Sequence, residues 1–399
     1  MRQYAIITGS YWAFTLTDGA LRMLVVLYFH QLGYSPLDIA LLFLFYELFG
    51  VITNLLGGWL AARVGLAATL IGGLFLQVGA LSMLLVDDAY LSVAYVMAAQ
   101  ALSGIAKDLN KMSAKSSVKL VAGDGEGRLY RWVAALTGSK NALKGVGFFL
   151  GGALLTAIGF RSAIAVMAFT LGVIAVVTLF VLDKELGKTS FKPKFNDLWS
   201  KSDKVNRLSA ARLFLFGSRD VWFVVALPVF LQLELGWSSV AVGTLLAVWV
   251  MGYGVVQVLS PTITGLRAGH HPHGGSAVAW GAALAGLPAL IVMAVALGVE
   301  PELAVVTGLI IFGAVFAINS AVHSYLIISY AQADGVSLDV GFYYMSNAAG
   351  RLVGTLCSGW IYQTWGFEAC LLVSTGFVVI ATLISLALPR ANPALEPDN

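Results

Sequence analysis

Charged residues are scarce in this chain. Of its 399 residues, 11% are Asp, Glu, Lys or Arg, whereas 59% are hydrophobic. A soluble domain carries about 25% charged residues, so the composition excludes an ordinary soluble domain and predicts a polytopic membrane protein. The net charge of +3 is too small to indicate a partner. We expect the lipid bilayer as surroundings and no nucleic-acid partner.

Cysteine is almost absent as well. Cys357 and Cys370 lie in apolar helical stretches, which excludes a disulfide framework, a CxxC metal site and a thiol cluster. The loop Gly-His-His-Pro-His at 269–273 resembles a metal-binding tract, but no carboxylate or thiol accompanies it. We therefore expect no metal site and no cofactor.

Long apolar segments make up most of the chain. A membrane span needs roughly 20 apolar residues, and twelve segments reach that length, six on each side of a polar linker. The first segment is too long for a signal-peptide core, so we take it as a spanning helix. The predicted spans are 4–29, 37–62, 66–86, 89–112, 129–158, 161–182, 208–232, 239–264, 276–299, 302–328, 341–364 and 367–388.

This pattern predicts an all-α membrane protein with twelve transmembrane helices in two pseudo-symmetric six-helix halves. We expect an N-terminal bundle over residues 1–182, a cytoplasmic linker over 183–207, and a C-terminal bundle with a short cytoplasmic tail over 208–399. Lys and Arg concentrate in alternate loops, which predicts that both termini are cytoplasmic. The end of the fourth helix is the least defined, because its pattern could continue to Leu120.

Two stretches about two hundred residues apart share a pattern of glycines around a cation. With a shift of 207 positions, Lys144 falls on Arg351 and Gly147 falls on Gly354. Parallel six-helix repeats of this kind build transporters with a site near the membrane midplane. Similar offsets match LGYS at 32–35 with LGWS at 235–238, Gly104 with Gly313, and Asn110 with Asn319.

The predicted spans contain more basic than acidic residues. A charge at mid-bilayer costs roughly 2.5–3.5 kcal/mol on insertion scales, and buried ionisable groups usually line a pathway or a site. An excess of cations predicts an anionic substrate, and the planar fork of arginine suits carboxylate, phosphate or arsenate oxygens. The six cations are Arg22, Lys140, Lys144, Arg212, Arg219 and Arg351, and the three acids are Asp18, Glu47 and Asp220.

Lys144 and Arg351 are the strongest candidates for substrate contact, because the repeat places a cation at the same depth in both halves. The remaining buried charges receive less specific roles. We expect substrate contacts from Lys140, Lys144, Arg351, Arg219 and Arg22, and ion coupling or ion pairing from Asp18, Glu47 and Asp220.

Structural pairing is the alternative for several of these residues. Asp18 and Arg22 are four residues apart and can pair within one helix. Arg219 and Asp220 are adjacent and point about 100° apart on a helix, so we expect different partners for them. Arg212 is close enough to the inner surface to extend its charge into water.

Lysines recur every four residues at the inner end of the fourth predicted helix. They form either a basic cytoplasmic face that follows the positive-inside bias or an electrostatic entrance for an anion. The residues are Lys107, Lys111, Lys115 and Lys119, of which the first three are the candidates for the entrance.

The six-plus-six arrangement and the central linker resemble the Major Facilitator Superfamily. GGWLAARVG at 57–65 is similar to its signature between helices two and three, although Ala62 replaces the usual aspartate. Gly147, Gly151 and Gly152 resemble the glycine motif of superfamily antiporters, but Phe148 stands where that motif has proline. Antiport therefore does not follow from this motif.

A closer resemblance is to the ArsJ-type organoarsenical efflux permeases. It extends over nearly the whole chain, and what it implies is export of arsenylated phosphoglycerate, the ester that a glyceraldehyde-phosphate dehydrogenase makes from arsenate. The blocks that carry it are TDGALRMLVVLYFHQLGYSP, TNLLGGWLAARVGL, TGSKNALKGVGFFLGG and FGSRDVWFVVALPVF.

The residues and the resemblance lead to one functional prediction. We expect a transporter of the bacterial inner membrane that exports an organic oxyanion, arsenylated phosphoglycerate (1-arseno-3-phosphoglycerate), by alternating access and thereby confers arsenate resistance. The partners expected are the small anionic substrate and, by functional coupling, the dehydrogenase; enzymatic activity is not expected. The alternatives are a general organophosphate or phosphate exchanger of the same fold and a polytopic membrane enzyme or sensor.

Overall fold

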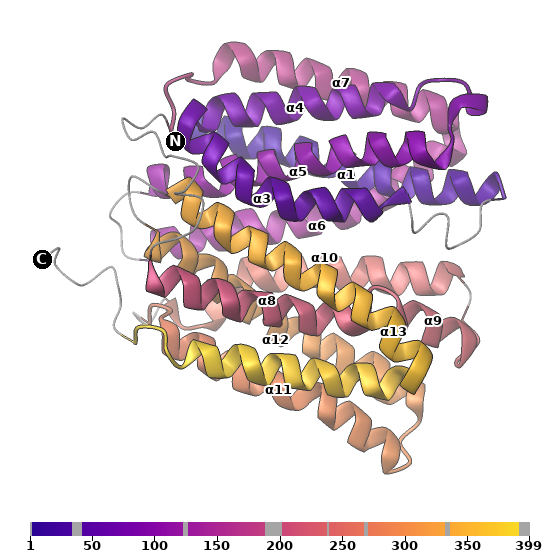
Figure 1. The fold of residues 1–399 in the computed structure, drawn as a ribbon, viewed down its shortest axis with the longest axis vertical. Coiled ribbons are helices and arrows are strands. Elements are labelled where there is room, and N and C mark those ends of the chain that lie inside the picture. The colour runs from indigo at the N-terminus through magenta and orange to yellow at the C-terminus, as the bar shows by residue number, and fades with distance from the viewer. Residues whose placement is uncertain are drawn as a thin grey trace, which may run out of the picture. The chain divides into compact units, whose positions relative to one another are not determined.

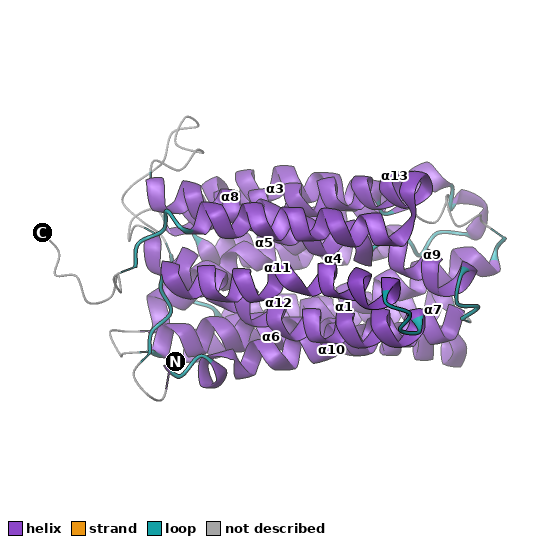
Figure 2. Cartoon of the chain, turned by 90° about the horizontal axis from the view of Figure 1, so that it is seen from below, coloured by secondary structure: helices purple, strands orange, loops and turns teal. Residues whose placement is uncertain are grey.

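The computed structural model describes residues 2–33, 42–122, 127–187, 202–237, 239–266, 270–331 and 336–390. Within these ranges the chain forms helices joined by short loops and contains no strand (Figure 2). A helix forms the hydrogen bonds of its backbone internally, which is necessary in a bilayer because lipid tails cannot form them. Large apolar side chains also face outward, as on one helix where Phe169 is 75% and Phe180 is 81% exposed. The prediction of an all-α membrane protein is confirmed.

Each predicted apolar segment overlaps a helix of the structure, and Figure 1 labels these helices. The first part of the chain forms α1 (Arg2–Gln31), α3 (Leu44–Val64), α4 (Leu66–Met83), the short 3-10 helix η1 (Asp88–Tyr90), α5 (Val93–Ala122), α6 (Arg128–Ile158) and α7 (Phe160–Val181). The second part forms α8 (Asp203–Phe223), α9 (Ala226–Leu233), α10 (Ser239–Ile263), α11 (Gly274–Ala296), α12 (Pro301–Tyr330) and α13 (Val336–Ser385).

Ten helical stretches in the described ranges are long and apolar enough to cross a membrane, with α8 and α9 acting as one of them. The 50-residue helix α13 is broken at Gly366, whose φ is 79°. This break lies between the predicted spans 341–364 and 367–388. Helix α5 extends to Ala122, past the possible end at Leu120. The count of twelve spans stays a prediction.

The chain divides into two compact units. Unit 1 contains Met1–Gly123, Ser139–Trp199 and Gln332–Met345. Unit 2 contains Asp124–Gly138, Ser200–Ala331 and Ser346–Asn399. Helices α6 and α13 therefore each contribute to both units. The predicted linker, 183–207, lies mostly outside the described residues, and the predicted domain limits stay predictions.

Unit 1 is organised around α5. This helix packs against α1, α3 and α4, while α7 covers α1 and α4. The core between them is apolar, and its aromatic residues meet near the ends of α1 and α7, where the rings of Tyr28 and Phe160 stack with centroids 4.1 Å apart. The helices that carry most of the N-terminal charged residues are thus held by one common core.

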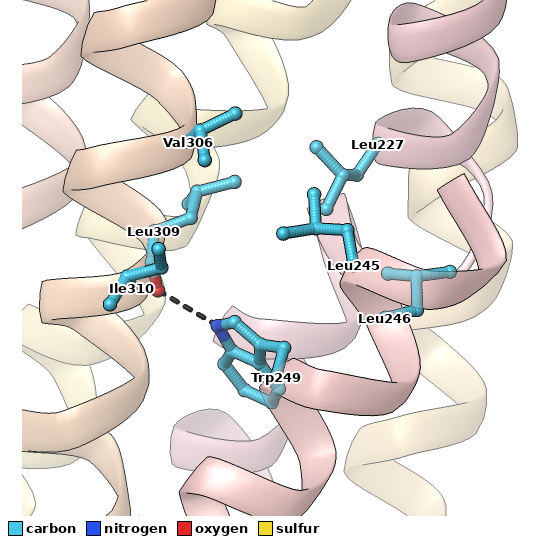
Figure 3. Close-up of a pocket in the computed structure, with 7 residues that line it drawn as sticks. All are labelled: Leu227, Leu245, Leu246, Trp249, Val306, Leu309 and Ile310. Carbon is cyan, nitrogen blue, oxygen red and sulfur yellow. Dashed lines mark hydrogen bonds between the residues drawn. The ribbon is translucent and has the colours of Figure 1, made fainter. Parts of the chain in front are cut away.

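Unit 2 is organised around α12, which packs against α8, α10 and α11. Its core is rich in aromatic residues, and the Trp222 ring meets the Phe312 ring edge-on with centroids 5.2 Å apart. The Trp249 indole donates a hydrogen bond to the carbonyl oxygen of Leu309 at 2.9 Å, at the bottom of an apolar hollow (Figure 3). This bond ties α10 to α12 and satisfies the one polar atom of a buried ring.

Glycines of the repeated stretches make equivalent helix crossings in the two units. In unit 1 a Cβ added at Gly147 of α6 would lie 2.7 Å from the Leu16 carbonyl oxygen of α1. In unit 2 a Cβ added at Gly354 of α13 would lie 2.7 Å from the Gly217 carbonyl oxygen of α8. Both positions admit only hydrogen, so the backbones approach closely, as small residues allow in membrane helices. Residues that match in the repeat thus make matching contacts.

We predict that Gly147→Ala lowers the melting temperature of the protein in detergent. The added methyl group meets backbone atoms that cannot turn away, and overpacking of this kind costs about 1–3 kcal/mol. The matched control is Gly152→Ala on the same helix, where the Cβ would meet only Leu27 Cδ1, at 3.8 Å. Equal melting temperatures for the two variants would contradict the close crossing of α1 and α6.

Candidate functional site

Charged side chains of α1 meet polar side chains of α3 inside unit 1. The Tyr46 hydroxyl donates to Asp18 Oδ1 at 2.6 Å, and Arg22 Nη2 lies 3.2 Å from Glu47 Oε1. Asp18 is 5% exposed, whereas the side chains of Arg22 and Glu47 are each 28% exposed. Asp18 and Arg22 of α1 therefore each have a partner on α3.

A cluster on α5 lies beside Tyr46. Lys111 Nζ lies 2.6 Å from Asp108 Oδ1, and Lys107 Nζ lies 3.7 Å from Asp108 Oδ2. The Lys107 ammonium also sits 3.8 Å from the centre of the Tyr46 ring. Lys115, one turn further along, is 3% exposed. The three lysines proposed for an anion entrance are thus mostly buried, and whether an anion passes them stays a prediction.

Asp108 is a functional candidate that sequence reasoning missed. It lies within the predicted span 89–112 and is 1% exposed, yet it is absent from the three predicted membrane acids. Its position three residues before Lys111 is a spacing of helical ion pairs. An acid at this spacing from a lysine is the signal in the sequence that indicates Asp108.

The two lysines of α6 belong to unit 1 and are only partly buried. Lys140 Nζ donates to the side-chain oxygen of Asn141 at 3.2 Å. Lys144 Nζ lies 6.0 Å from the centre of the Phe148 ring. Phe148, which replaces the proline of the antiporter motif, is thus a neighbour of the candidate lysine. Arg351, its counterpart in the repeat, belongs to unit 2.

Asp220 of α8 binds two arginines in unit 2. Arg219 Nη2 and Nε lie 2.5 Å and 2.6 Å from Asp220 Oδ1. Arg351 Nε of α13 lies 3.1 Å from Asp220 Oδ2. The expectation that Arg219 and Asp220 need different partners is wrong, because the long arginine side chain bends around the helix and covers the 100° between them. One carboxylate therefore serves cations from two helices.

Aromatic rings surround Arg219. Its guanidinium carbon lies 5.1 Å from the centre of the Phe216 ring and 5.7 Å from the centres of the Phe223 and Phe316 rings. Cation–π contacts with desolvated arginine are worth about 2 kcal/mol or more. They hold the guanidinium in place together with Asp220, which accepts from its Nε and pairs with its Nη2.

Arg212 is buried, which corrects the expectation that its charge reaches water. It is 2% exposed; its Nε donates to the Asn347 side-chain oxygen at 2.9 Å and its Nη1 to the Ser320 carbonyl oxygen at 3.2 Å. Helix α8 begins at Asp203, earlier than the predicted span, so Arg212 lies more than two turns inside it. Its donors meet acceptors of α12 and α13, which gives it a role in joining these helices.

Around Asp220 the two cations are partly exposed and the acid is not. The side chains of Arg219 and Arg351 are 14% and 29% exposed, whereas Asp220 is fully buried at 0%. Two cations and one acid leave a net charge of +1 at this place. Partly exposed guanidinium groups beside a buried carboxylate have the charge and the donor geometry that an oxyanion site needs.

In the histidine tract, His273 caps the start of α11. His273 Nδ1 accepts a hydrogen bond from the Gly275 backbone at 3.0 Å, and Ser276 Oγ accepts one from the His273 backbone at 3.2 Å. Together they form a reciprocal cap of the helix. The part of the chain that the structure describes contains no group of three His, Cys, Asp or Glu residues placed to hold a metal ion.

Comparisons with known proteins agree with this arrangement. Membrane-spanning helices that bury paired charges are typical of transporters. The family model of the Major Facilitator Superfamily matches residues 7–272, which is more than half of the chain, and the chain belongs to this superfamily of membrane transporters. A search of curated proteins found no match.

Several solved structures have a similar fold. The human organic anion transporter MFSD10 (TETRAN) has a TM-score of 0.73 at 16% identity and covers 96% of this chain and 99% of its own. A bacterial homologue of the iron transporter ferroportin, in an outward-facing state, has a TM-score of 0.73 at 14% identity over 97% and 99%. The proton:xylose symporter XylE has a TM-score of 0.72 at 12% identity over 96% and 95%. At such identities the likeness shows the fold alone.

We predict that Asp220→Asn destabilises the protein strongly. The amide keeps the shape but leaves Arg219 and Arg351 without their counter-charge, and breaking a buried pair costs about 3–5 kcal/mol. The control is Asp203→Asn on the same helix, since Asp203 pairs with Arg207 and its side chain is 77% exposed. Thermal unfolding in detergent should give a clearly lower melting temperature for Asp220→Asn only, and similar values for both variants would show that Asp220 has no such role.

Proposed function

We propose that this transporter exports an organic oxyanion, arsenylated phosphoglycerate, by alternating access. The observation that carries the proposal is the cluster of Arg219, Arg351 and Asp220. Its two guanidinium groups are partly exposed, its carboxylate is buried, and its net charge is positive. Such a site attracts an anion, and a guanidinium fork can bind two oxygens of a tetrahedral or carboxylate group at once.

The chemistry of the arsenical supports this substrate over arsenite. Trivalent arsenite prefers thiolate ligands, whereas a pentavalent arsenate ester is a multiply charged oxyanion. Of the two cysteines, Cys370 is buried, and its Sγ lies 3.9 Å from the Ser358 carbonyl oxygen. Lysine and arginine, rather than cysteine, are therefore the ligands that this chain offers.

The resemblance to ArsJ-type permeases supplies the particular substrate. Four sequence blocks carry it, and one of them, FGSRDVWFVVALPVF, contains Arg219 and Asp220. The solved structure of a human organic anion transporter with the same fold is consistent with this substrate class. We propose that a glyceraldehyde-phosphate dehydrogenase supplies the ester in the cytoplasm. The protein would lie in a bacterial inner membrane with both termini cytoplasmic and confer arsenate resistance.

Direction would come from coupling to an ion. Asp18 and Glu47 in unit 1 and Asp220 in unit 2 are the candidate carriers. Asp18 accepts one hydrogen bond from Tyr46 and is 5% exposed. We propose that the cations bind the substrate and that Asp18 takes part in ion coupling.

We predict that inside-out vesicles containing the protein accumulate arsenic only when arsenate, glyceraldehyde-phosphate, the oxidised nicotinamide cofactor and the dehydrogenase are all present. Omitting the dehydrogenase removes the ester and should reduce accumulation to the level of vesicles without the protein. Accumulation of arsenate alone would rule out the proposed substrate. Rapid uptake of inorganic phosphate or phosphoglycerate would instead identify a general organophosphate exchanger.

We predict that Lys144→Ala and Arg351→Ala each abolish this uptake while the protein still reaches the membrane. Each variant removes a cation from its own unit, and Arg351→Lys should restore only part of the activity because an ammonium lacks the fork. The controls are Arg161→Ala in unit 1 and Arg207→Ala in unit 2, whose side chains are 50% and 46% exposed and pair with surface acids. Normal uptake by Lys144→Ala or Arg351→Ala would remove that residue from the site.

A further inference from the structure

Unit 1 contains a cluster of the same composition as the Asp220 cluster. In both, one aspartate is flanked by two cations: Lys107 and Lys111 around Asp108 in unit 1, and two arginines around Asp220 in unit 2. We propose that Lys107 and Lys111 form a second oxyanion-binding site, and that Asp108 is its internal occupant, which the bound anion displaces.

The two lysines hold Asp108 unequally. Lys111 Nζ is at hydrogen-bond distance, 2.6 Å from Oδ1, whereas Lys107 Nζ is 3.7 Å from Oδ2. Oδ2 is buried and accepts no hydrogen bond from the described residues. A buried carboxylate oxygen normally accepts at least one hydrogen bond. The carboxylate is therefore an imperfect partner for Lys107, which an oxyanion with more oxygens would satisfy better.

Access to this cluster is through the cations. The side chains of Lys107 and Lys111 are 16% and 15% exposed, whereas that of Asp108 is 1% exposed. Two cations and one acid again leave a net charge of +1. An anion therefore encounters the two ammonium groups before the carboxylate of Asp108.

Neighbouring residues hold the ammonium groups independently of Asp108. Lys107 Nζ lies 3.8 Å from the centre of the Tyr46 ring, and Lys111 Nζ lies 4.8 Å from the centre of the Tyr344 ring. A Cβ added at Gly50 would lie 3.0 Å from Asp108 Oδ2 and 3.8 Å from Lys107 Nζ. The Asp108 carboxylate thus packs against the backbone at Gly50, and the two rings give the lysines contacts that do not involve Asp108.

This site deepens the proposed function, because it gives unit 1 its own contact with the anion. The inference rests on the proposed function only for the chemical class of the ligand. The ligand is a tetrahedral oxyanion or a carboxylate. Lysine provides a compact charge with three donors, whereas the arginines of unit 2 provide planar forks. The unit 1 site should therefore be less selective for the shape of the anion than the unit 2 site.

The test measures thermal stabilisation of the purified protein by inorganic phosphate at constant ionic strength. In Asp108→Asn the two lysines lose their internal anion, so phosphate should bind about tenfold more tightly and raise the melting temperature at lower concentration than in the wild type. The matched control is Asp87→Asn, an exposed acid of unit 1 that lies 3.1 Å from Arg161. It should respond to phosphate as the wild type does.

A double variant removes the risk that Asp108→Asn is simply unstable. Asp108→Asn with Lys111→Met takes away one cation together with the acid, so it should fold and lose the additional phosphate response. All variants retain Arg219 and Arg351, so only the differences between them report on unit 1. Equal phosphate responses of Asp108→Asn and Asp87→Asn, or an undiminished response of the double variant, would overturn the proposal. Neither result depends on the dehydrogenase-coupled transport assay, so the two proposals fail separately.

Discussion

A charge buried inside the membrane needs a counter-charge or hydrogen-bond acceptors from neighbouring groups, and this requirement accounts for the positions of many polar side chains in the protein. Asp108 and Asp220 have almost no access to water, and each is held between two basic residues. Removing one partner from such an arrangement costs more than the pair contributes, because the other charge stays buried. In unit 2 the pair of Asp220 and Arg351 therefore joins α8 to α13 by charge as well as by packing.

The length of apolar segments and the length of charged side chains explain which parts of the sequence-based prediction succeeded. Helix positions depend on apolar length and on residues such as Gly366, so the segments and the all-α membrane fold could be read from the sequence. The partner of a charged side chain depends on how far that side chain extends from its helix. Arg219 bends back to its neighbour Asp220, and Arg212 finds acceptors on α12 and α13, because arginine is long enough to cover distances that helix geometry alone does not predict. The substrate roles of Lys144 and Arg351 stay predictions.

Family membership and site chemistry limit the function to different degrees. The superfamily match establishes a membrane transporter, and solved structures of this fold include proteins described as transporters of organic anions, iron and xylose. The fold alone therefore does not select a substrate. Our proposal of an anionic substrate rests instead on the buried charges, because the basic side chains of the two clusters are 14–29% exposed while their carboxylates are at most 1% exposed.

The position of each aspartate in the chain has a consequence for biosynthesis. Asp108 and both its lysines lie on α5, and Asp220 is adjacent to Arg219 on α8. Each pair can form as soon as its own helix forms, before later helices are made. An isolated Asp, Lys or Arg adds about 2.5–3.5 kcal/mol to the insertion of a helix centre, and local pairing lowers that cost during translation. Arg351 is synthesised more than a hundred residues after Asp220. It enters the membrane with its counter-charge already in place, so α13 can dock onto α8 as the last step in assembling the charge cluster.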